Sequence, residues 1–159
     1  METIISRHAK SSVRKMGSKR KEILKCALSD DLESLQQLFQ AICVTEEPLE
    51  QDLFGEKDEA GRNALLIASM LGRSAIVREL VRHGAEVDER TVRGYTSLHL
   101  ASCWGHLETV RTLLELGADT QVKTFRGERP VDLARKYSKT DCADFLSQCD
   151  PGADKSGVD

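Results

Sequence analysis

Apolar residues recur along this chain in pairs of short segments, and each segment stops near a glycine. Within residues 96–117, Leu98 and Ala101 share one helical face before Gly105. Further apolar residues, three and four positions apart, then run up to Gly117. Two short helices joined by a glycine turn bury too little surface to be stable alone. The pattern therefore predicts helical hairpins that stack on one another.

The same pattern returns with a period of 33 residues. The positions that keep this step are Gly61, Gly94 and Gly127; Gly72 and Gly105; Gly84 and Gly117; and Ala68, Ala101 and Ala134. A period of this length is typical of solenoids built from paired helices, and small alanines let neighbouring helices approach closely. We therefore predict an all-α chain in one domain, with each hairpin packed against the next.

One copy of the repeat carries a recognisable motif. Thr96, Ser97, Leu98, His99 and Ala101 stand where ankyrin repeats have Thr-Pro-Leu-His-x-Ala, and only the serine departs from it. The chain thus resembles the ankyrin repeat family. This resemblance implies an all-α ankyrin-repeat solenoid of about four helix-turn-helix repeats with short hairpin loops. It also implies that His99 ties adjacent repeats together through both ring nitrogens and has no chemical role.

The first repeat is less regular than the others. The segment at 32–35 parallels the one at 107–110 with an offset of 75 positions, whereas two regular steps make 66, so nine extra residues lie within about 41–57. This insertion is acidic, and it is either a solvated finger or an acidic docking site. The expected organisation is a basic, disordered arm at 1–19, repeats at about 20–57, 58–90, 91–123 and 124–150, and a flexible tail at 151–159.

Charge is distributed unevenly along the chain. Residues 1–25 hold eight basic and two acidic side chains, whereas the whole chain has a formal net charge of −3. We expect residues 1–18 to be disordered or a frayed helix. A mitochondrial transit peptide and a nuclear-import cluster at 19–21 are alternative interpretations. Nucleic-acid binding is disfavoured, because the body is acidic and the arm lacks interleaved aromatic residues.

Several function classes find no support in the sequence. There is no apolar run of about 18 residues, the length that a membrane-spanning helix needs. The five cysteines lack metal-ligand spacing and are expected to be reduced thiols. His8 and His83 have no companion at ligand spacing. Phosphate-binding glycine loops and nucleophile elbows are absent too, so we expect no enzyme activity and no cofactor or metal.

Candidate binding residues follow from the resemblance, because ankyrin repeats usually bind partners through hairpin tips and the exposed side of the inner helices. The matching positions are Arg62, Met70, Leu71, Arg93, Tyr95, Cys103, Trp104, Phe125, Arg126 and Tyr137. This set contains the only tryptophan and both tyrosines of a chain with 4% aromatic residues. Tryptophan, tyrosine and arginine dominate binding hot spots. Arg93 and Arg126 would lie on adjacent tips and favour a carboxylate-bearing partner.

The sequence therefore predicts a non-enzymatic adaptor or scaffold module that binds a partner protein, such as an acidic peptide or helix. We expect a monomer with no membrane or nucleic-acid partner. The expected location is the cytoplasm, with the nucleus or the cytoskeleton as further options. Two alternatives stay open at this point. The aromatic residues could merely cover the core, or the same surface could bind another copy of the chain and form a structural scaffold.

Overall fold

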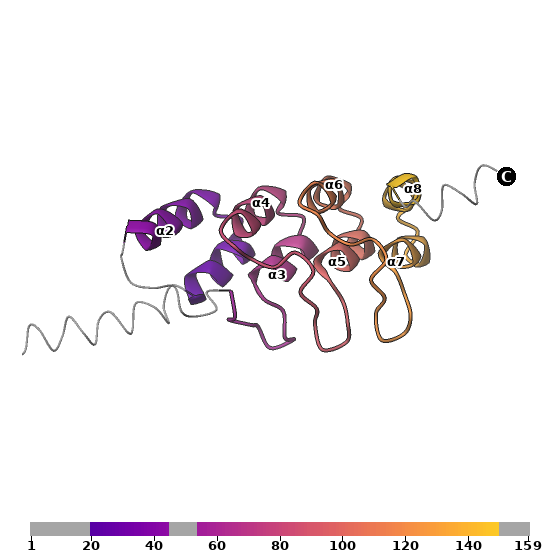
Figure 1. The fold of residues 1–159 in the computed structure, drawn as a ribbon, viewed down its shortest axis with the longest axis horizontal. Coiled ribbons are helices and arrows are strands. Elements are labelled where there is room, and N and C mark those ends of the chain that lie inside the picture. Colours follow the sequence, from indigo (N-terminus) through magenta and orange to yellow (C-terminus); the bar gives the residue numbers. More distant parts are fainter. Residues whose placement is uncertain (1–19, 45–53, 150–159) are drawn as a thin grey trace, which may run out of the picture.

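The computed structural model describes residues 20–44 and 54–149, which form two rows of helices stacked along one axis (Figure 1). The inner row consists of a helix at residues 20–29, α3 (Ala64–Met70), α5 (Ser97–Trp104) and α7 (Pro130–Lys136). The outer row consists of α2 (Leu32–Val44), α4 (Ser74–Arg82), α6 (Leu107–Glu115) and α8 (Thr140–Cys149). Each inner helix pairs with the outer helix that follows it, and we refer to these pairs as the first to fourth repeats. The predicted all-α solenoid is thereby confirmed.

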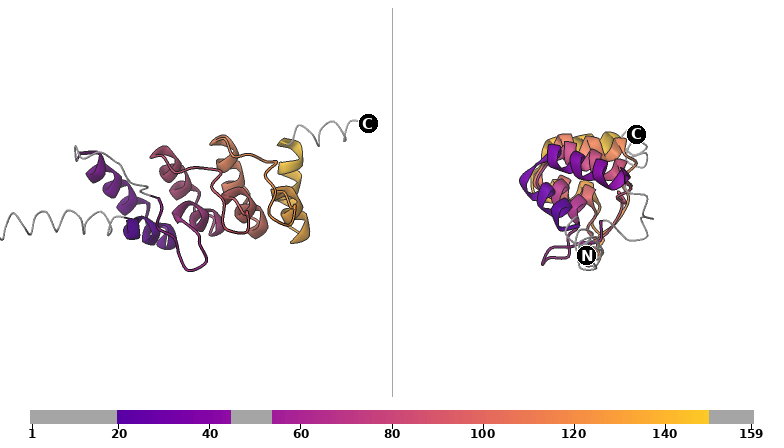
Figure 2. Two further views of the ribbon diagram at one scale, coloured as in Figure 1. Left: turned by 60° about the horizontal axis from the view of Figure 1, so that its bottom comes forward. Right: turned by 90° about the vertical axis from the view of Figure 1, so that its left-hand side faces the viewer.

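The loop tips that precede α3, α5 and α7 project on the side of the inner row (Figure 1). When the stack is viewed from its end, the helices of each row lie behind one another (Figure 2). The rows are therefore parallel layers, and the loops line up as a series of tips. No strand is assigned anywhere in residues 20–44 and 54–149, so the tips are turns only.

Each loop tip closes with the same backbone turn. In the third repeat the N–H of Thr91 donates to the carbonyl oxygen of Tyr95, and the N–H of Gly94 donates to that of Thr91. Gly94 has φ +86°, a left-handed conformation that is costly for a residue with a Cβ atom. The equivalent turns begin at Asp58 and Thr124. Gly61, Gly94 and Gly127 therefore hold the same position in three successive tips, which explains their spacing of 33 residues.

A second recurring turn joins the two helices of each repeat. One backbone bond spanning five residues is present in all four: Asp31 to Cys26, Arg73 to Ala68, His106 to Ala101 and Lys139 to Ala134, each written donor first. The residue before the donor is left-handed every time. It is Gly72 or Gly105 in the middle repeats, but Asp30 (φ 58°) in the first and Ser138 (φ 60°) in the fourth. The first and fourth repeats are therefore built like the middle two, although they lack the glycine.

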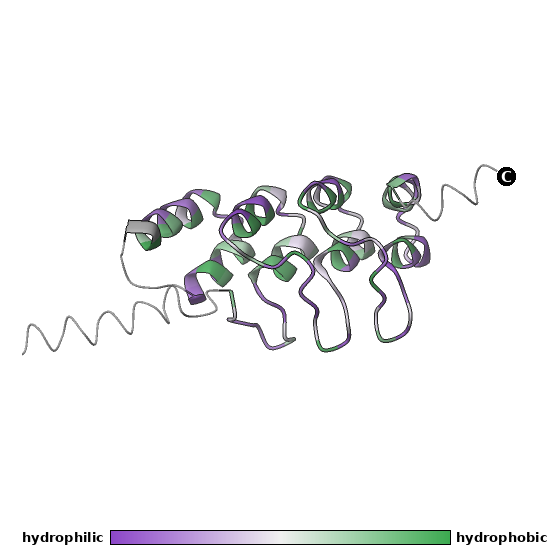
Figure 3. Ribbon diagram, viewed as in Figure 1, coloured by the Kyte–Doolittle hydropathy of each residue, from purple (hydrophilic) through white to green (hydrophobic). Residues whose placement is uncertain are grey.

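The core lies between the two rows and between neighbouring repeats. Ala68, Ala101 and Ala134 of the inner row are fully buried, as are Leu80 and Leu113 of the outer row. Hydrophobic residues gather on the helices, whereas the loops carry mostly hydrophilic residues (Figure 3). Each buried large aliphatic side chain contributes roughly 1.5–3 kcal/mol. Because these residues pack across repeat boundaries, the stack stabilises hairpins that would be marginal alone.

Neighbouring repeats are also joined by a basic residue that follows each left-handed turn. Arg73 lies 3.8 Å from the Asp30 carboxylate of the preceding repeat. The His106 ring covers Gly72 so closely that a Cβ atom there would meet its Nδ1 at 2.7 Å. The stem of Lys139 covers the corresponding glycine of the third repeat in the same way. Each of the last three repeats thus reaches back over the turn of its predecessor.

The extra length of the first repeat is partly helical. Helix α2 has 13 residues, whereas α4 and α6 have nine each. Within the range of the predicted insertion, Phe54 packs against Phe39 of α2 with ring centroids 6.1 Å apart. Residues 45–53 of that range, the basic arm at 1–19 and the tail at 151–159 lie outside the described residues. No helix in the described part of the chain is long and apolar enough to cross a membrane.

Candidate partner-binding surface

The ten candidate residues fall into two rows along the stack. The tip row, on the loop turns, comprises Arg62, Arg93, Tyr95, Phe125 and Arg126. The helix-end row, at the C-terminal ends of the inner helices, comprises Met70, Leu71, Cys103, Trp104 and Tyr137. None of the ten is fully buried. We call the two rows together the recognition surface.

The tips of the third and fourth repeats touch each other directly. The backbone N–H of Phe125 donates to the carbonyl oxygen of Arg93 at 3.0 Å. A Cβ atom on Gly94 would meet the backbone nitrogen of Phe125 at 3.1 Å, so the glycine also permits this close approach. The Phe125 side chain remains 78% exposed. The contact therefore sets the backbones of Arg93 and Phe125 side by side.

A shallow depression lies between the tips of the second and third repeats. Its volume is about 450 Å³. Arg62, Arg93 and Tyr95 line it, together with Ala60, Thr91, Val92 and Leu100. Leu100 comes from helix α5, so the depression reaches from the tips to the side of the inner row. The structure thus brings together three of the candidate residues around a partly apolar floor.

Arg62 is occupied within its own repeat. Its Nε donates to Asp58 Oδ2 at 2.9 Å, and its Nη1 lies 2.7 Å from the sulfur of Met70. Burial acts to raise the pKa of Asp58, but the hydrogen bonds from the Arg62 backbone and side chain outweigh it and lower that pKa. The guanidinium of Arg62 therefore stabilises its own turn and is less available to a partner than the sequence suggests.

Arg93 and Arg126 differ from Arg62 in this respect. Both are exposed, and neither forms an ion pair with a carboxylate among the described residues. Two further basic residues, Arg90 and Lys123, lie in the same two loops, and an Arg90 Nη atom donates to the Lys123 carbonyl oxygen. The loop segments 90–97 and 121–127 contain no acidic residue. The edge formed by the third and fourth tips is therefore basic on an otherwise acidic body.

The helix-end row carries large apolar side chains at intervals of 33 residues, of which Trp104 and Tyr137 are exposed and Leu71 is partly buried against the core. Leu71, Trp104 and Tyr137 occupy equivalent positions at the ends of α3, α5 and α7. Trp104 is 59% exposed and Tyr137 is 49% exposed. The indole is thus open to solvent, which contradicts the alternative that Trp104 only covers the core. An exposed aromatic residue next to other apolar groups is the usual appearance of a binding surface.

Cys103 lies within this row but is not set up for chemistry. Its side chain is half-buried, and burial raises the pKa of the thiol, although nearby Lys139 and Lys136 act in the opposite direction. A raised pKa keeps the thiol protonated at neutral pH, and the protonated form is a poor nucleophile. Cys103 is therefore a partly buried, protonated thiol that precedes Trp104 in α5.

The two rows belong to one continuous surface. In the second repeat the Arg62 side chain reaches Met70, eight positions later. In the fourth repeat the equivalent positions hold Glu128 and Lys136, whose charged groups lie 3.3 Å apart. Tyr95 and Cys103 occupy these positions in the third repeat. A partner that contacts the tips can therefore also contact the helix ends.

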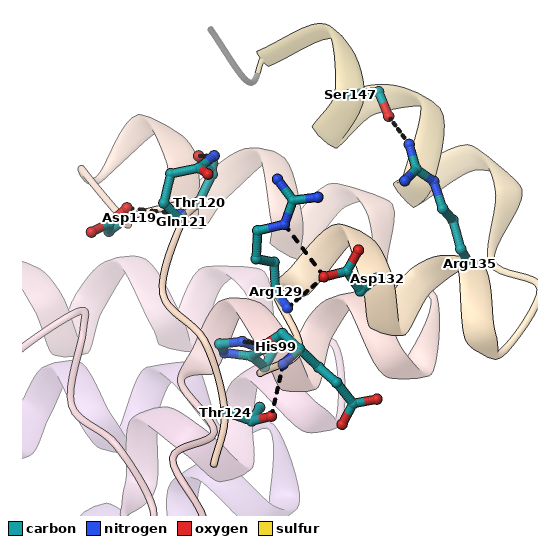
Figure 4. A network of polar contacts seen from close by, with 10 residues as sticks. His99, Asp119, Thr120, Gln121, Thr124, Arg129, Asp132, Arg135 and Ser147 are labelled. Carbon is teal, nitrogen blue, oxygen red and sulfur yellow. Dashed lines mark hydrogen bonds and ion pairs between the residues drawn. The ribbon is translucent and has the colours of Figure 1, made fainter. Parts of the chain in front are cut away.

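His99 lies beneath this surface and joins the third and fourth repeats (Figure 4). Its Nδ1 lies 2.8 Å from the Thr96 hydroxyl, and its Nε2 lies 2.9 Å from the carbonyl oxygen of Glu128. Burial lowers the pKa of His99, although the carbonyl groups of Glu128 and Val122 oppose the shift. Tyr95 packs edge-on against the imidazole, at 6.0 Å between ring centroids. The predicted structural role of His99 through both ring nitrogens is confirmed.

The other polar contacts in this region also stabilise the fold. Figure 4 shows Asp132 accepting from the backbone and side chain of Arg129 at the start of α7, and Arg135 donating to Ser147 of α8. Within residues 20–44 and 54–149, no three side chains of metal-ligating type come together. These groups hold the fourth repeat in place and do not form a catalytic arrangement.

One histidine contact was missed by the sequence analysis. We predicted that His83 has no companion, but its Nε2 lies 3.0 Å from Glu79 Oε1, one helical turn earlier on α4. The ring also stacks on Phe39 of the first repeat at a centroid distance of 4.0 Å. The spacing of four between Glu79 and His83 was visible in the sequence. The stacking was not, because it depends on how the irregular first repeat packs.

Comparison with known proteins agrees with the motif and the geometry. A family model described as "Ankyrin repeats (3 copies)" matches residues 23–124. The human ankyrin repeat domain-containing protein 45 is 47% identical over 128 residues, which is 80% of this chain and 48% of the human protein. The protein of the same name from Danio rerio is 50% identical over 128 residues, which is 80% of this chain and 57% of that protein.

A third relative with that name, from Mus musculus, is 40% identical over 77 residues, which is 46% of this chain and 30% of the mouse protein. The chain spans about half the length of the human and zebrafish relatives that it matches. The family match covers most of the described repeats, and the tip turns, paired helices and bridging histidine all follow the same plan. The chain belongs to the ankyrin repeat family.

Proposed function

We propose that this chain is a non-enzymatic adaptor module that binds a partner protein through the recognition surface. Ankyrin repeat proteins generally act as protein–protein interaction modules, and the fold itself is a non-enzymatic one. The observation that carries the proposal is the coincidence of exposed aromatic and unpaired basic groups. Trp104, Phe125 and Tyr137 are about half or more exposed, and Arg93 and Arg126 have no carboxylate partner among the described residues.

The arrangement suits partner recognition for two physical reasons. An exposed indole or phenyl ring offers a large apolar area that binding can remove from water, and this area dominates hot-spot energetics. A guanidinium without an internal partner can form a bidentate pair with a carboxylate of the partner. Arg93 is fixed beside Phe125 by a backbone hydrogen bond, so an apolar and a charged contact can form together.

The experiment that tests the proposal is affinity capture with matched variants. Trp104→Ala removes an exposed apolar side chain from the recognition surface, and Arg82→Ala removes an exposed side chain from outer helix α4. We expect the unmodified chain and Arg82→Ala to capture the same proteins from a cell extract, and Trp104→Ala to lose them. Equal capture by all three would refute the proposal.

Self-association through the same surface is distinguished by a second measurement. Sedimentation at increasing concentration should give the mass of one chain throughout. A mass that doubles with concentration, and that stays monomeric in Trp104→Ala, would instead show that the surface binds another copy. In that case the structural-scaffold hypothesis replaces the adaptor.

A further inference from the structure

We infer that the partner segment is an α-helix that lies along the stack, with apolar side chains at seven-residue intervals and acidic side chains along one flank. This inference rests on the proposed function, and it specifies the shape and the chemistry of the occupant. It is carried by three properties of the recognition surface: the spacing of its repeated positions, the separation of its two rows and the difference in their charge.

The first property is the spacing along the stack. Leu71, Trp104 and Tyr137 recur once per repeat, at the ends of α3, α5 and α7, which are neighbours in the inner row (Figure 1). Packed helices lie about 8–10 Å apart. Seven residues of an α-helix rise about 10.5 Å, and three residues of a polyproline II chain, which make one turn, rise about 9 Å. A helix would therefore present every seventh residue to successive sites, and a polyproline II chain would present every third.

The second property, the separation of the rows, decides between these two shapes. Helix α5 has eight residues and runs from the tip beside Tyr95 to Trp104. At about 1.5 Å per residue the two rows are about 12 Å apart. A helix with its side chains is about 10–12 Å across, and its contacting face is a stripe several residues wide, so it spans this width. A polyproline II chain directs only a single line of side chains, every third residue, at one surface. The helix is therefore the shape that fits both rows.

The third property is the contrast in charge between the rows. The tip edge of the third and fourth repeats carries Arg90, Arg93, Lys123 and Arg126, and the one acidic residue of its turns, Glu128, is paired with Lys136. The equivalent positions of the helix-end row are uncharged at Leu71, Trp104 and Tyr137. A helix that matches both rows has an apolar stripe facing the helix ends and carboxylates on the neighbouring flank facing the tips.

The test uses a phage-displayed library of random 21-residue peptides selected against the intact chain. Enriched sequences should have apolar residues seven apart and an excess of Asp and Glu on one helical flank. A synthetic peptide from the enriched set should gain helical circular dichroism when it binds. Enriched apolar residues three apart, an excess of basic residues, or no enrichment would overturn the inference.

Variants of the chain then separate this inference from the proposed function. Arg93→Glu and Arg126→Glu should each weaken binding of the enriched peptide about tenfold, whereas Arg82→Glu, an exposed reversal on outer helix α4, should leave it unchanged. Trp104→Ala should also weaken it at least tenfold. Peptides with a three-residue period that still require Trp104 would refute the helical partner but retain the proposed function. Peptides that ignore every surface variant would refute both.

Discussion

The Nε2 atom of His99 lies 2.9 Å from the carbonyl oxygen of Glu128, so one imidazole spans the boundary between the third and fourth repeats. The side chain is completely buried. The other ring nitrogen is held by Thr96 at the start of the same helix. Because both nitrogens are used inside the protein, this contact couples the start of α5 to the next tip. It leads to the first two predictions.

Replacing His99 with alanine should lower the free energy of unfolding by about 2–4 kcal/mol. The change leaves a cavity and removes one of the two hydrogen bonds that the Glu128 carbonyl oxygen accepts, the other coming from the Thr124 N–H. Urea denaturation followed by circular dichroism measures the difference. Arg82→Ala, at an exposed position, should stay within about 0.5 kcal/mol of the unmodified chain. A His99→Ala variant as stable as Arg82→Ala would contradict the bridging role.

The same residue makes stability depend on pH. Burial lowers the pKa of His99 in the folded chain, whereas the unfolded chain has a pKa of about 6.5 at this residue. Below about pH 6.5 the unfolded state therefore binds more protons than the folded state. The contribution of His99 is fully present above this pH and is lost as pH falls through the folded pKa.

Denaturation at a series of pH values from about 7.5 down to 5 should show this loss. The free energy of unfolding should fall by up to about 1.4 kcal/mol per pH unit on account of this group. A His99→Gln variant should have a shallower slope, and His106→Gln should keep the slope because His99 is still present. Identical slopes in all three proteins would exclude His99 as the source.

Replacing Ser97 with proline should stabilise the chain by about 1 kcal/mol. The Ser97 hydroxyl is buried and has no hydrogen-bond partner, and Thr96 before it has ψ 174°, which is compatible with a following proline. Proline at the first position of a helix needs no N–H, and Pro130 occupies that position in α7. Ser97→Ala separates the effect of the hydroxyl from that of the rigid ring. A loss of stability in Ser97→Pro, measured by thermal denaturation, would contradict the prediction.

Two glycine-to-alanine substitutions should differ in cost, although both glycines are left-handed. At Gly127 (φ +79°) a Cβ atom meets nothing within 4 Å, so only the backbone strain of about 1–2 kcal/mol applies. At Gly72 (φ +75°) the Cβ atom also meets the His106 ring, so Gly72→Ala should cost about 1–3 kcal/mol more than Gly127→Ala.

The double variant Gly72→Ala with His106→Ala identifies the cause of this difference. Removing the ring leaves room for the added methyl group, so the two substitutions should be non-additive, with the pair less costly than the sum. Chemical denaturation of the four proteins of this cycle measures the coupling. Additive costs would show that the His106 ring does not constrain Gly72.

The fluorescence of Trp104 reports directly on the recognition surface, because it is the only tryptophan. With 59% of its surface exposed, the indole should emit at long wavelength and be quenched readily by acrylamide. Binding of the library-derived peptide should shift the emission to shorter wavelength and protect it from the quencher. Blue, quencher-resistant emission from the free chain would show that the ring is already covered.

The 33-residue period predicts the second, third and fourth repeats well, because equivalent positions in successive repeats hold the same residue type wherever the structure constrains them. Gly94 and Gly127 occupy equivalent tips, and Ala101 and Ala134 occupy equivalent buried sites. The bridging histidine also follows from the motif. Positions with a fixed backbone conformation or complete burial tolerate few residue types, so they remain readable in sequence.

The ends of the stack and the side-chain pairings were harder to predict. Asp30 and Ser138 take the left-handed positions in place of glycine, and short polar residues of this kind do so too rarely to signal a turn. The contacts of the Arg62 side chain with Asp58 and Met70 depend on the conformation of this long side chain, which the repeat pattern does not specify. The recognition surface was located by position within the repeat, but which of its arginines remain unpaired required coordinates.

Arg73, His106 and Lys139, which each contact the turn of the preceding repeat, restrict how the repeats of this chain can be rearranged. Arg73 fits a turn that carries a carboxylate at Asp30, whereas the His106 ring fits a turn without a side chain at Gly72. A turn and the basic residue of the following repeat are therefore matched pairs rather than interchangeable parts. Duplicating, deleting or transplanting one repeat with cuts between these partners would mismatch them. A graft into another solenoid should carry each turn together with the start of the outer helix that follows in the next repeat.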